Sequence, residues 1–165
     1  MRQSEAEFFS ELKLSAENNV TKLGIPVRRS SRSEAEEGNL DDYTSFVQVS
    51  GAIQGGVIFT VDVQLAIAMA QSYLIDPVTP EEAKSYAVEV VAELTNVICG
   101  NALTDRVPHP IYLGNPLLFV AKQAEIRTRS AKPFLQLFGT DKGSFRIMYI
   151  PMDQESELAT IMNAQ

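Results

Sequence analysis

The segment from residue 80 to residue 103 constrains the fold most, because it combines a continuous helical pattern with one wholly apolar side. It opens with Pro80, Glu81 and Glu82, and a proline followed by acidic residues suits the positive end of a helix dipole. At about 100° per residue, one side collects apolar residues. These are Ala87, Val91, Leu94, Ile98 and Ala102. Such a side needs a second layer to cover it, so the pattern predicts a long helix packed on a sheet.

Segments rich in β-branched and aromatic residues supply that sheet. Residues 43–50 and 57–61 predict two strands joined through a glycine-containing turn. Residues 134–140 and 144–150 flank Asp-Lys-Gly and predict the clearest hairpin in the chain. Residues 117–128 read as one further strand. The last three strands are expected to pair with one another in antiparallel order.

Two other helices complete the element order. Apolar residues recur every three or four positions over residues 3–23, and Gly24 follows as a suitable end. Asp62 is placed to cap a shorter helix rich in Leu, Ile, Ala and Met. The predicted order is helix, strand, strand, helix, helix, strand, strand, strand. This order predicts an α+β fold, with an antiparallel sheet packed against long helices.

The chain of 165 residues is expected to form a single domain, residues 1–165. Within it, residues 28–42 are dense in Ser, Glu and Arg and predict a mobile, solvated loop. Residues 151–165 predict a C-terminal tail that is at most a short, weakly amphipathic helix.

Composition excludes several kinds of function. With 14 basic and 21 acidic residues the net charge is −7, which disfavours binding to nucleic acid or to an anionic membrane. One cysteine and one histidine, Cys99 and His109, exclude an internal disulfide and a multi-ligand zinc site, so no metal or cofactor bound by this chain is expected. The first residues show no signal-peptide pattern, which predicts a cytoplasmic protein. Residues 43–61 lack charge, but their glycines and polar residues make a poor membrane helix.

The other side of the 80–103 helix is the candidate site. Six polar or glycine positions fall within about 80° of one another on it. They are Glu82, Ser85, Glu89, Glu93, Asn96 and Gly100. Glu93 and Asn96 are three residues apart, so their side chains lie one turn apart and can touch the same object. A glycine inside a helix costs about 1 kcal/mol relative to alanine, and close approach of another backbone would explain Gly100. Judged by spacing alone, a side of this kind is most often a plain solvated surface.

The stretch of residues 93–101, Glu-Leu-Thr-Asn-Val-Ile-Cys-Gly-Asn, resembles the signature helix of the CheX and CheC chemotaxis phosphatases, being closer to CheX. The glycine-bearing hairpin of residues 51–59 also looks like the one that precedes the helix pair in CheX. The resemblance implies a CheC-like fold and hydrolysis of the aspartyl phosphate on a CheY-like response regulator. Asn96 would then position the hydrolytic water and Glu93 would dock the regulator, with Glu89 and Gly100 as further contacts to this partner.

The same resemblance implies that Mg²⁺ belongs to the regulator and that the protein is a homodimer formed through the sheet. The first helix has no acidic residue three positions before an asparagine, so one site per chain is expected. The alternative is a non-catalytic binding or adaptor module for a receiver domain, because a fold and its partner surface can persist without the chemistry. Of the neighbouring residues, Cys99 is interpreted as a packing thiol and Asn101 as a buried amide.

Overall fold

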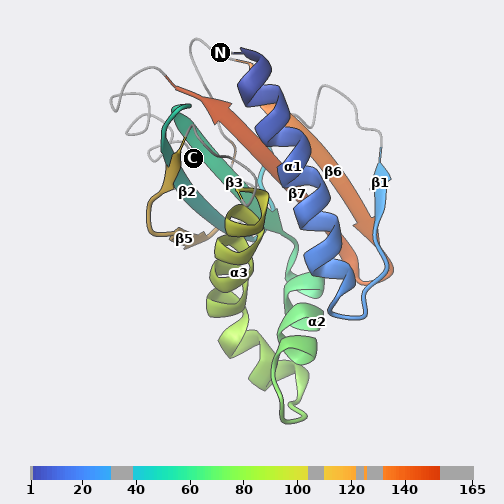
Figure 1. Ribbon diagram of the computed structural model, residues 1–165. Coiled ribbons are helices and arrows are strands. Elements are labelled where there is room, and N and C mark those ends of the chain that lie inside the picture. The colour runs from blue at the N-terminus through green and yellow to red at the C-terminus, as the bar shows by residue number, and fades with distance from the viewer. Residues whose placement is uncertain (1, 31–38, 104–109, 122–124, 126–131, 153–165) are drawn as a thin grey trace.

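The computed structural model describes residues 2–30, 39–103, 110–121, 125 and 132–152. Within these residues the chain forms three helices and a seven-stranded sheet (Figure 1). The elements are α1 (Arg2–Thr21), β1 (Arg28–Ser30), β2 (Tyr43–Gly51), β3 (Gly55–Val61), α2 (Val63–Tyr73), α3 (Pro80–Ala102), β4 (Ile111–Leu113), β5 (Leu117–Val120), β6 (Phe134–Thr140) and β7 (Gly143–Pro151).

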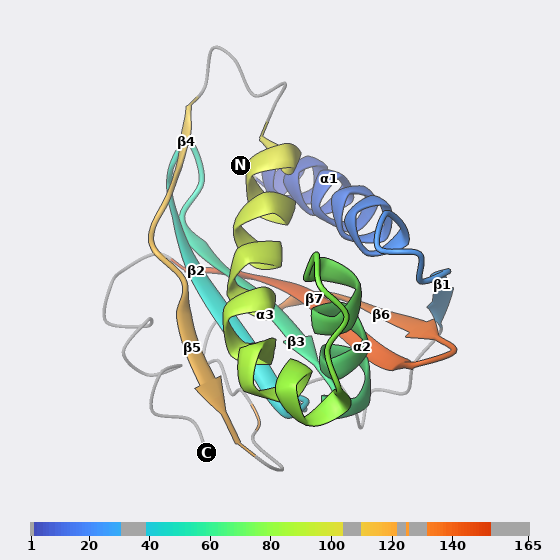
Figure 2. The same cartoon turned by 90° about the horizontal axis from the view of Figure 1, so that it is seen from below.

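The architecture has two layers, with the three helices on one face of the sheet (Figures 1 and 2). The strand order is β1-β6-β7-β3-β2-β4, and β5 also pairs with β2. Every one of these pairings is antiparallel. The predicted α+β class, with an antiparallel sheet under long helices, is therefore confirmed.

Both predicted hairpins are present. β2 and β3 pair from Tyr43 opposite Val61 to Val49 opposite Gly55. β6 and β7 pair through a tight turn that ends at Gly143, whose φ of +143° is a conformation that side chains rarely adopt. Local turn chemistry was sufficient to predict each pair.

The prediction that the last three strands pair with one another is right for β6 and β7 and wrong for β5. β5 does not join β6; it pairs with β2, from Tyr43 opposite Val120 to Phe46 opposite Leu117. The C-terminal hairpin instead adds to the other side of β3, through β7, while β1 pairs with β6. β4 and β5 both follow α3 in the chain, α3 packs over β2, and both strands pair with β2.

Two short strands were not predicted. Arg28–Ser30, the start of the expected loop at 28–42, forms β1, and the Arg29 guanidinium makes an ion pair of 2.8 Å with Glu17 on α1. At the end of the same segment Leu40 is buried, so this part of the segment is not a solvated loop; residues 31–38 lie outside the described residues. Ile111–Leu113 forms β4.

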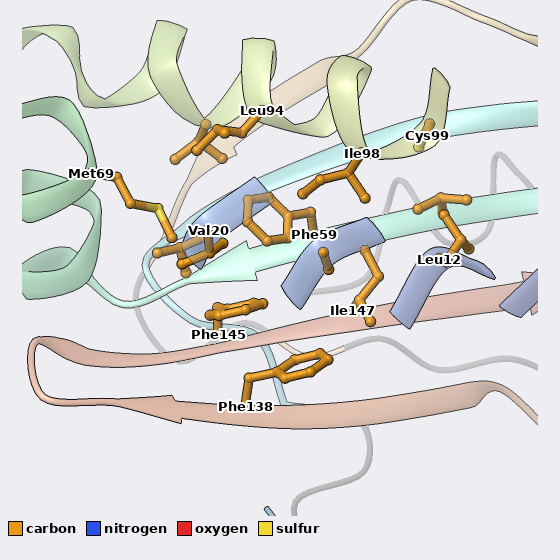
Figure 3. Packing of buried hydrophobic residues seen from close by; sticks show 14 of the residues in the cluster. Leu12, Val20, Phe59, Met69, Leu94, Ile98, Cys99, Phe138, Phe145 and Ile147 are labelled. Carbon is orange, nitrogen blue, oxygen red and sulfur yellow. The ribbon is translucent and has the colours of Figure 1, made fainter. Parts of the chain in front are cut away.

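The main core lies between the helices and the sheet (Figure 3). All three helices and several strands contribute buried side chains to it. Those labelled in Figure 3 are Leu12, Val20, Phe59, Met69, Leu94, Ile98, Cys99, Phe138, Phe145 and Ile147. A second, smaller cluster is built from Leu40, Phe46, Ile58, Met148, Ile150 and Met152. The inner sides of α1 and α3 are therefore committed to packing, and only their outer sides remain for function.

Asp62 ties the start of α2 to the C-terminal hairpin. Its carboxylate accepts the N-cap hydrogen bond from the Leu65 N–H at 2.8 Å and a second bond from the Ser144 N–H at 2.6 Å. The predicted cap is thus confirmed, and the same side chain also joins two elements that are distant in the sequence. None of the described helices has the length and apolar character needed to cross a bilayer.

Candidate functional site

The helix that carries the candidate site, α3, begins at a reciprocal cap. The Thr79 hydroxyl accepts from the Glu82 N–H at 3.2 Å, and the Glu82 carboxylate accepts from the Thr79 N–H at 3.3 Å. Pro80 occupies the first helical position, where its missing N–H costs nothing. This cap fixes where α3 begins, and the helix continues for 23 residues.

The inner side of α3 is buried as the sequence predicted. Its buried residues are Ala83, Ala87, Val90, Val91, Leu94, Thr95, Ile98, Cys99 and Ala102. Thr95, the polar member of this set, donates its hydroxyl to the Val91 carbonyl at 2.7 Å. From α1, the Ser15 hydroxyl donates to the Ile98 carbonyl at 2.8 Å. Packing and one interhelical hydrogen bond therefore hold α3 against rotation.

All six positions of the predicted stripe lie on the exposed side: Glu82, Ser85, Glu89, Glu93, Asn96 and Gly100. Glu93 and Asn96 are both exposed and lie one turn apart, in the middle of a helix whose other side is in the core. A rigid element thus presents a carboxylate and a neutral amide together to solvent. This arrangement suits contact with another macromolecule, because the two groups need no rearrangement to meet it.

Tyr86 belongs to the same exposed side and was missed in the sequence. It precedes Glu93 by seven residues, nearly two full turns, so the two side chains lie within about 20° of one another. Its side chain is 49% exposed. The helical spacing carries this signal, since position 86 lies on the same side as positions 82, 89 and 93, but an aromatic residue does not match a polar pattern.

The surroundings of Gly100 and Asn101 differ from those expected from the sequence. A Cβ added at Gly100 would meet no atom within 4 Å, so no backbone of this chain approaches it among the described residues. Asn101 is exposed, so its interpretation as a buried amide is wrong. It lies in the last turn of α3, one residue before the helix ends.

Cys99 is fully buried, which confirms its interpretation as a packing thiol. Burial raises the pKa of this thiol to about 12, so at neutral pH it is protonated and unreactive. His109 lies outside the described residues. Among the residues that are described, no group of three or more His, Cys, Asp or Glu side chains is placed to hold a metal ion.

Comparison with known families bears directly on this helix. The family model for the chemotaxis phosphatase CheX matches residues 43–139, a span that includes β2, β3, α2 and all of α3. The chain belongs to the CheX chemotaxis phosphatase family. No curated protein matches the sequence.

Solved CheX structures share the fold. A CheX from Desulfovibrio desulfuricans superposes with a TM-score of 0.73 at 18% identity, over 88% of this chain and 99% of that chain. A CheX from Vibrio vulnificus gives a TM-score of 0.72 at 17% identity, over 87% of this chain and 95% of that chain. The Borrelia burgdorferi structure, a CheX–CheY–BeF₃–Mg²⁺ complex, gives 0.68 at 15% identity, over 89% and 98% respectively. At these identities the superpositions support the fold, while the family match supports the class of protein.

Proposed function

We propose that this chain hydrolyses the aspartyl phosphate of a CheY-like receiver domain, using Glu93 and Asn96 on the exposed side of α3. The observation that carries the proposal is the placement of these two residues, one turn apart and exposed, within the segment that the family model matches. The CheX of the Borrelia burgdorferi complex is bound to CheY, which makes a receiver domain the natural partner here.

Asn96 would position the water that attacks phosphorus. In hydrolysis, the water oxygen bonds to phosphorus, the bond from phosphorus to the aspartyl oxygen breaks, and inorganic phosphate and a free carboxylate result. This reaction needs placement of the nucleophile and neutralisation of charge more than covalent help from the protein. The amide oxygen of Asn96 accepts a hydrogen bond from water without bringing a negative charge beside the phosphoryl group.

Glu93 would dock the receiver by pairing with one of its lysines. A carboxylate one turn from the amide fixes how far the amide reaches into the receiver's phosphorylation site. Glu89 lies one turn before Glu93 on the exposed side, and Gly100 lies one turn after Asn96. We assign both to the same contact, Glu89 as a second acceptor and Gly100 as a place where the partner's backbone comes close.

Mg²⁺ in this proposal belongs to the receiver, where it would neutralise the phosphoryl oxygens. The complex from Borrelia burgdorferi contains Mg²⁺ together with CheY and BeF₃. This chain then supplies the water-positioning amide, and the receiver supplies the positive charge. The cytoplasmic location expected from the sequence stays a prediction.

A dimer through the sheet also stays a proposal, and we place its contact at the β4–β5 edge. Exposed large apolar side chains follow one another along β4 and β5: Tyr112, Leu117, Leu118 and Val120. Exposed apolar edge strands favour pairing with a second chain. Sedimentation analysis of the wild type and of a Leu118→Lys variant tests this proposal. A wild-type dimer and a monomeric variant would support a dimer contact at this edge, and identical sedimentation of the two proteins would refute it.

The proposed function is tested by phosphate release from a phosphorylated CheY-like receiver in the presence of Mg²⁺. Wild type is expected to accelerate release, Asn96→Ala to lose the acceleration while still binding, and Glu93→Ala to lose affinity and rate together. Asn18→Ala and Glu11→Ala serve as controls, because both residues are exposed on α1. Binding without acceleration by the wild type would instead identify an adaptor module.

A further inference from the structure

Apart from Leu14 on α1, the exposed large apolar side chains of the described residues fall into two groups along the chain. One group is on β4 and β5. The other runs from the end of α2 into α3, and consists of Tyr73, Ile75 and Tyr86. In Figure 1 the end of α2 and the start of α3 extend beyond the sheet. None of these three side chains belongs to the described hydrophobic core.

Tyr86 lies in line with the proposed site. It precedes Glu93 by about 10 Å along the helix axis and Asn96 by about 15 Å, at a rise of about 1.5 Å per residue. Glu82 and Glu89, one turn away on either side, are both exposed. The ring is thus a half-exposed aromatic group with carboxylates before and after it on a rigid helix.

Ile75 is the most exposed large apolar residue among those described. It lies in the connection between α2 and α3, and its side chain is 99% exposed. A side chain this exposed contributes nothing to the protein's own core, and in water it carries the full cost of apolar hydration. Tyr73, the last residue of α2 and two positions before Ile75, is 40% exposed.

The charge around Tyr86 restricts what can cover it. The exposed charged residues in this part of α3 are Glu81, Glu82, Lys84, Glu89 and Glu93, which leave an excess of three negative charges. A complementary surface has an apolar patch bordered by lysine or arginine. An acidic surface or a phosphate backbone would be repelled.

We propose that Tyr86, between Glu82 and Glu89 on the exposed side of α3, is the anchor of a distal docking surface for the receiver domain. This inference rests on the proposed function, because it takes the receiver as the partner. Tyrosines in partly desolvated positions commonly dominate interface energy, and here the ring would seat in an apolar patch bordered by basic side chains. Because the surface is remote from the reacting atoms, it would contribute equally to binding the substrate and the transition state, and so act on KM.

The test measures phosphate release over a range of phosphorylated receiver concentrations for wild type, Tyr86→Ala, Tyr86→Phe and Leu14→Ala. Leu14 is the matched control, since it is also 49% exposed but lies on α1. We expect Tyr86→Ala to raise KM about tenfold, with a much smaller change in kcat, and Tyr86→Phe to stay close to wild type. Wild-type KM in Tyr86→Ala, or an equal rise in Leu14→Ala, overturns the proposal.

A binding measurement separates this inference from the proposed function. A CheY-like receiver loaded with BeF₃⁻ and Mg²⁺ is titrated with wild type, Asn96→Ala and Tyr86→Ala. If Tyr86→Ala alone binds about tenfold more weakly, the docking surface stands, even if wild type releases no phosphate. If turnover is present but Tyr86→Ala binds as tightly as wild type, the docking surface fails and the catalytic proposal survives. Absence of binding by the wild type overturns both.

Discussion

The Ser15 hydroxyl on α1 donates a hydrogen bond of 2.8 Å to the main-chain carbonyl of Ile98 on α3, which lies 83 residues further along the chain. Asn19 reinforces it, since its amide donates to the Ser15 carbonyl at 2.8 Å and to the Ser15 hydroxyl at 3.2 Å. Ile98 follows Asn96 by two residues. A buried polar contact therefore fixes α1 to the part of α3 that carries the proposed site.

Replacing Ser15 by alanine should lower the free energy of unfolding by about 1 kcal/mol, because a buried interhelical hydrogen bond is lost. The melting temperature should fall by about 2–4 °C. Thermal unfolding followed by circular dichroism measures this. Ser10→Ala, an exposed change on the same helix, is the control, and equal melting of the two variants would contradict the structural role.

Asn96→Asp should reduce phosphate release by about 100-fold or more, although the shape of the side chain is preserved. The aspartate brings a negative charge toward the phosphoryl group, which repels it. Since Asn96 is exposed, the melting temperature should not change. Residual turnover near that of wild type would exclude the water-positioning role.

Gly100→Ala should act in opposite directions on stability and on capture of the receiver. Alanine is the better helix former by about 1 kcal/mol, and its Cβ would meet no atom of the described residues within 4 Å outside the helix's own backbone, so the protein should become more stable. If the partner's backbone approaches Gly100, the same methyl group should raise KM by about fivefold. Higher stability with unchanged KM would remove Gly100 from the contact.

Stability should decrease at alkaline pH, starting above about pH 9. Burial raises the pKa of Cys99 from 9.0 to about 12, and burial together with the Glu5 carboxylate raises the pKa of Tyr149. Between the unfolded and folded pKa values of the thiol, the unfolded chain has lost a proton that the folded chain keeps. The free energy of unfolding therefore falls as pH rises through that window and is fully retained below it.

Urea titrations at several pH values measure this dependence. Thiol alkylation with iodoacetamide provides an independent check at pH 9. Labelling of the folded protein should be slower than labelling in urea by about 100-fold or more, because the buried thiol stays protonated. Rapid labelling without denaturant would contradict the burial of Cys99.

The bounds of α3 and the two hairpins could be predicted because their signals are local. Pro80 and the acidic first turn mark the start of α3, and the periodicity that places Glu93 and Asn96 outside is a property of the helix itself. The 57–61 and 144–150 segments carry β-branched residues beside recognisable turns. For these elements, neighbours in the sequence are also neighbours in the structure.

The missed features depend on contacts with distant segments. β1 and β4 have three residues each, and pairing with β6 and β2 is what makes them strands. Likewise, nothing in residues 117–120 indicates that β5 pairs with β2 and not with β6. Whether Asn101 is buried depends on how far along α3 the other elements cover the helix, and the sequence of α3 does not encode this.

The proposed site and the hydrophobic core share helix α3, so a substitution in the core can displace the site. Leu94 and Ile98 lie in the core, within two residues of Asn96. A substitution that turned α3 by one residue would carry the amide about 100° away from any partner. Natural selection for the function of Asn96 would therefore constrain the buried apolar residues of α3 as strictly as its exposed residues.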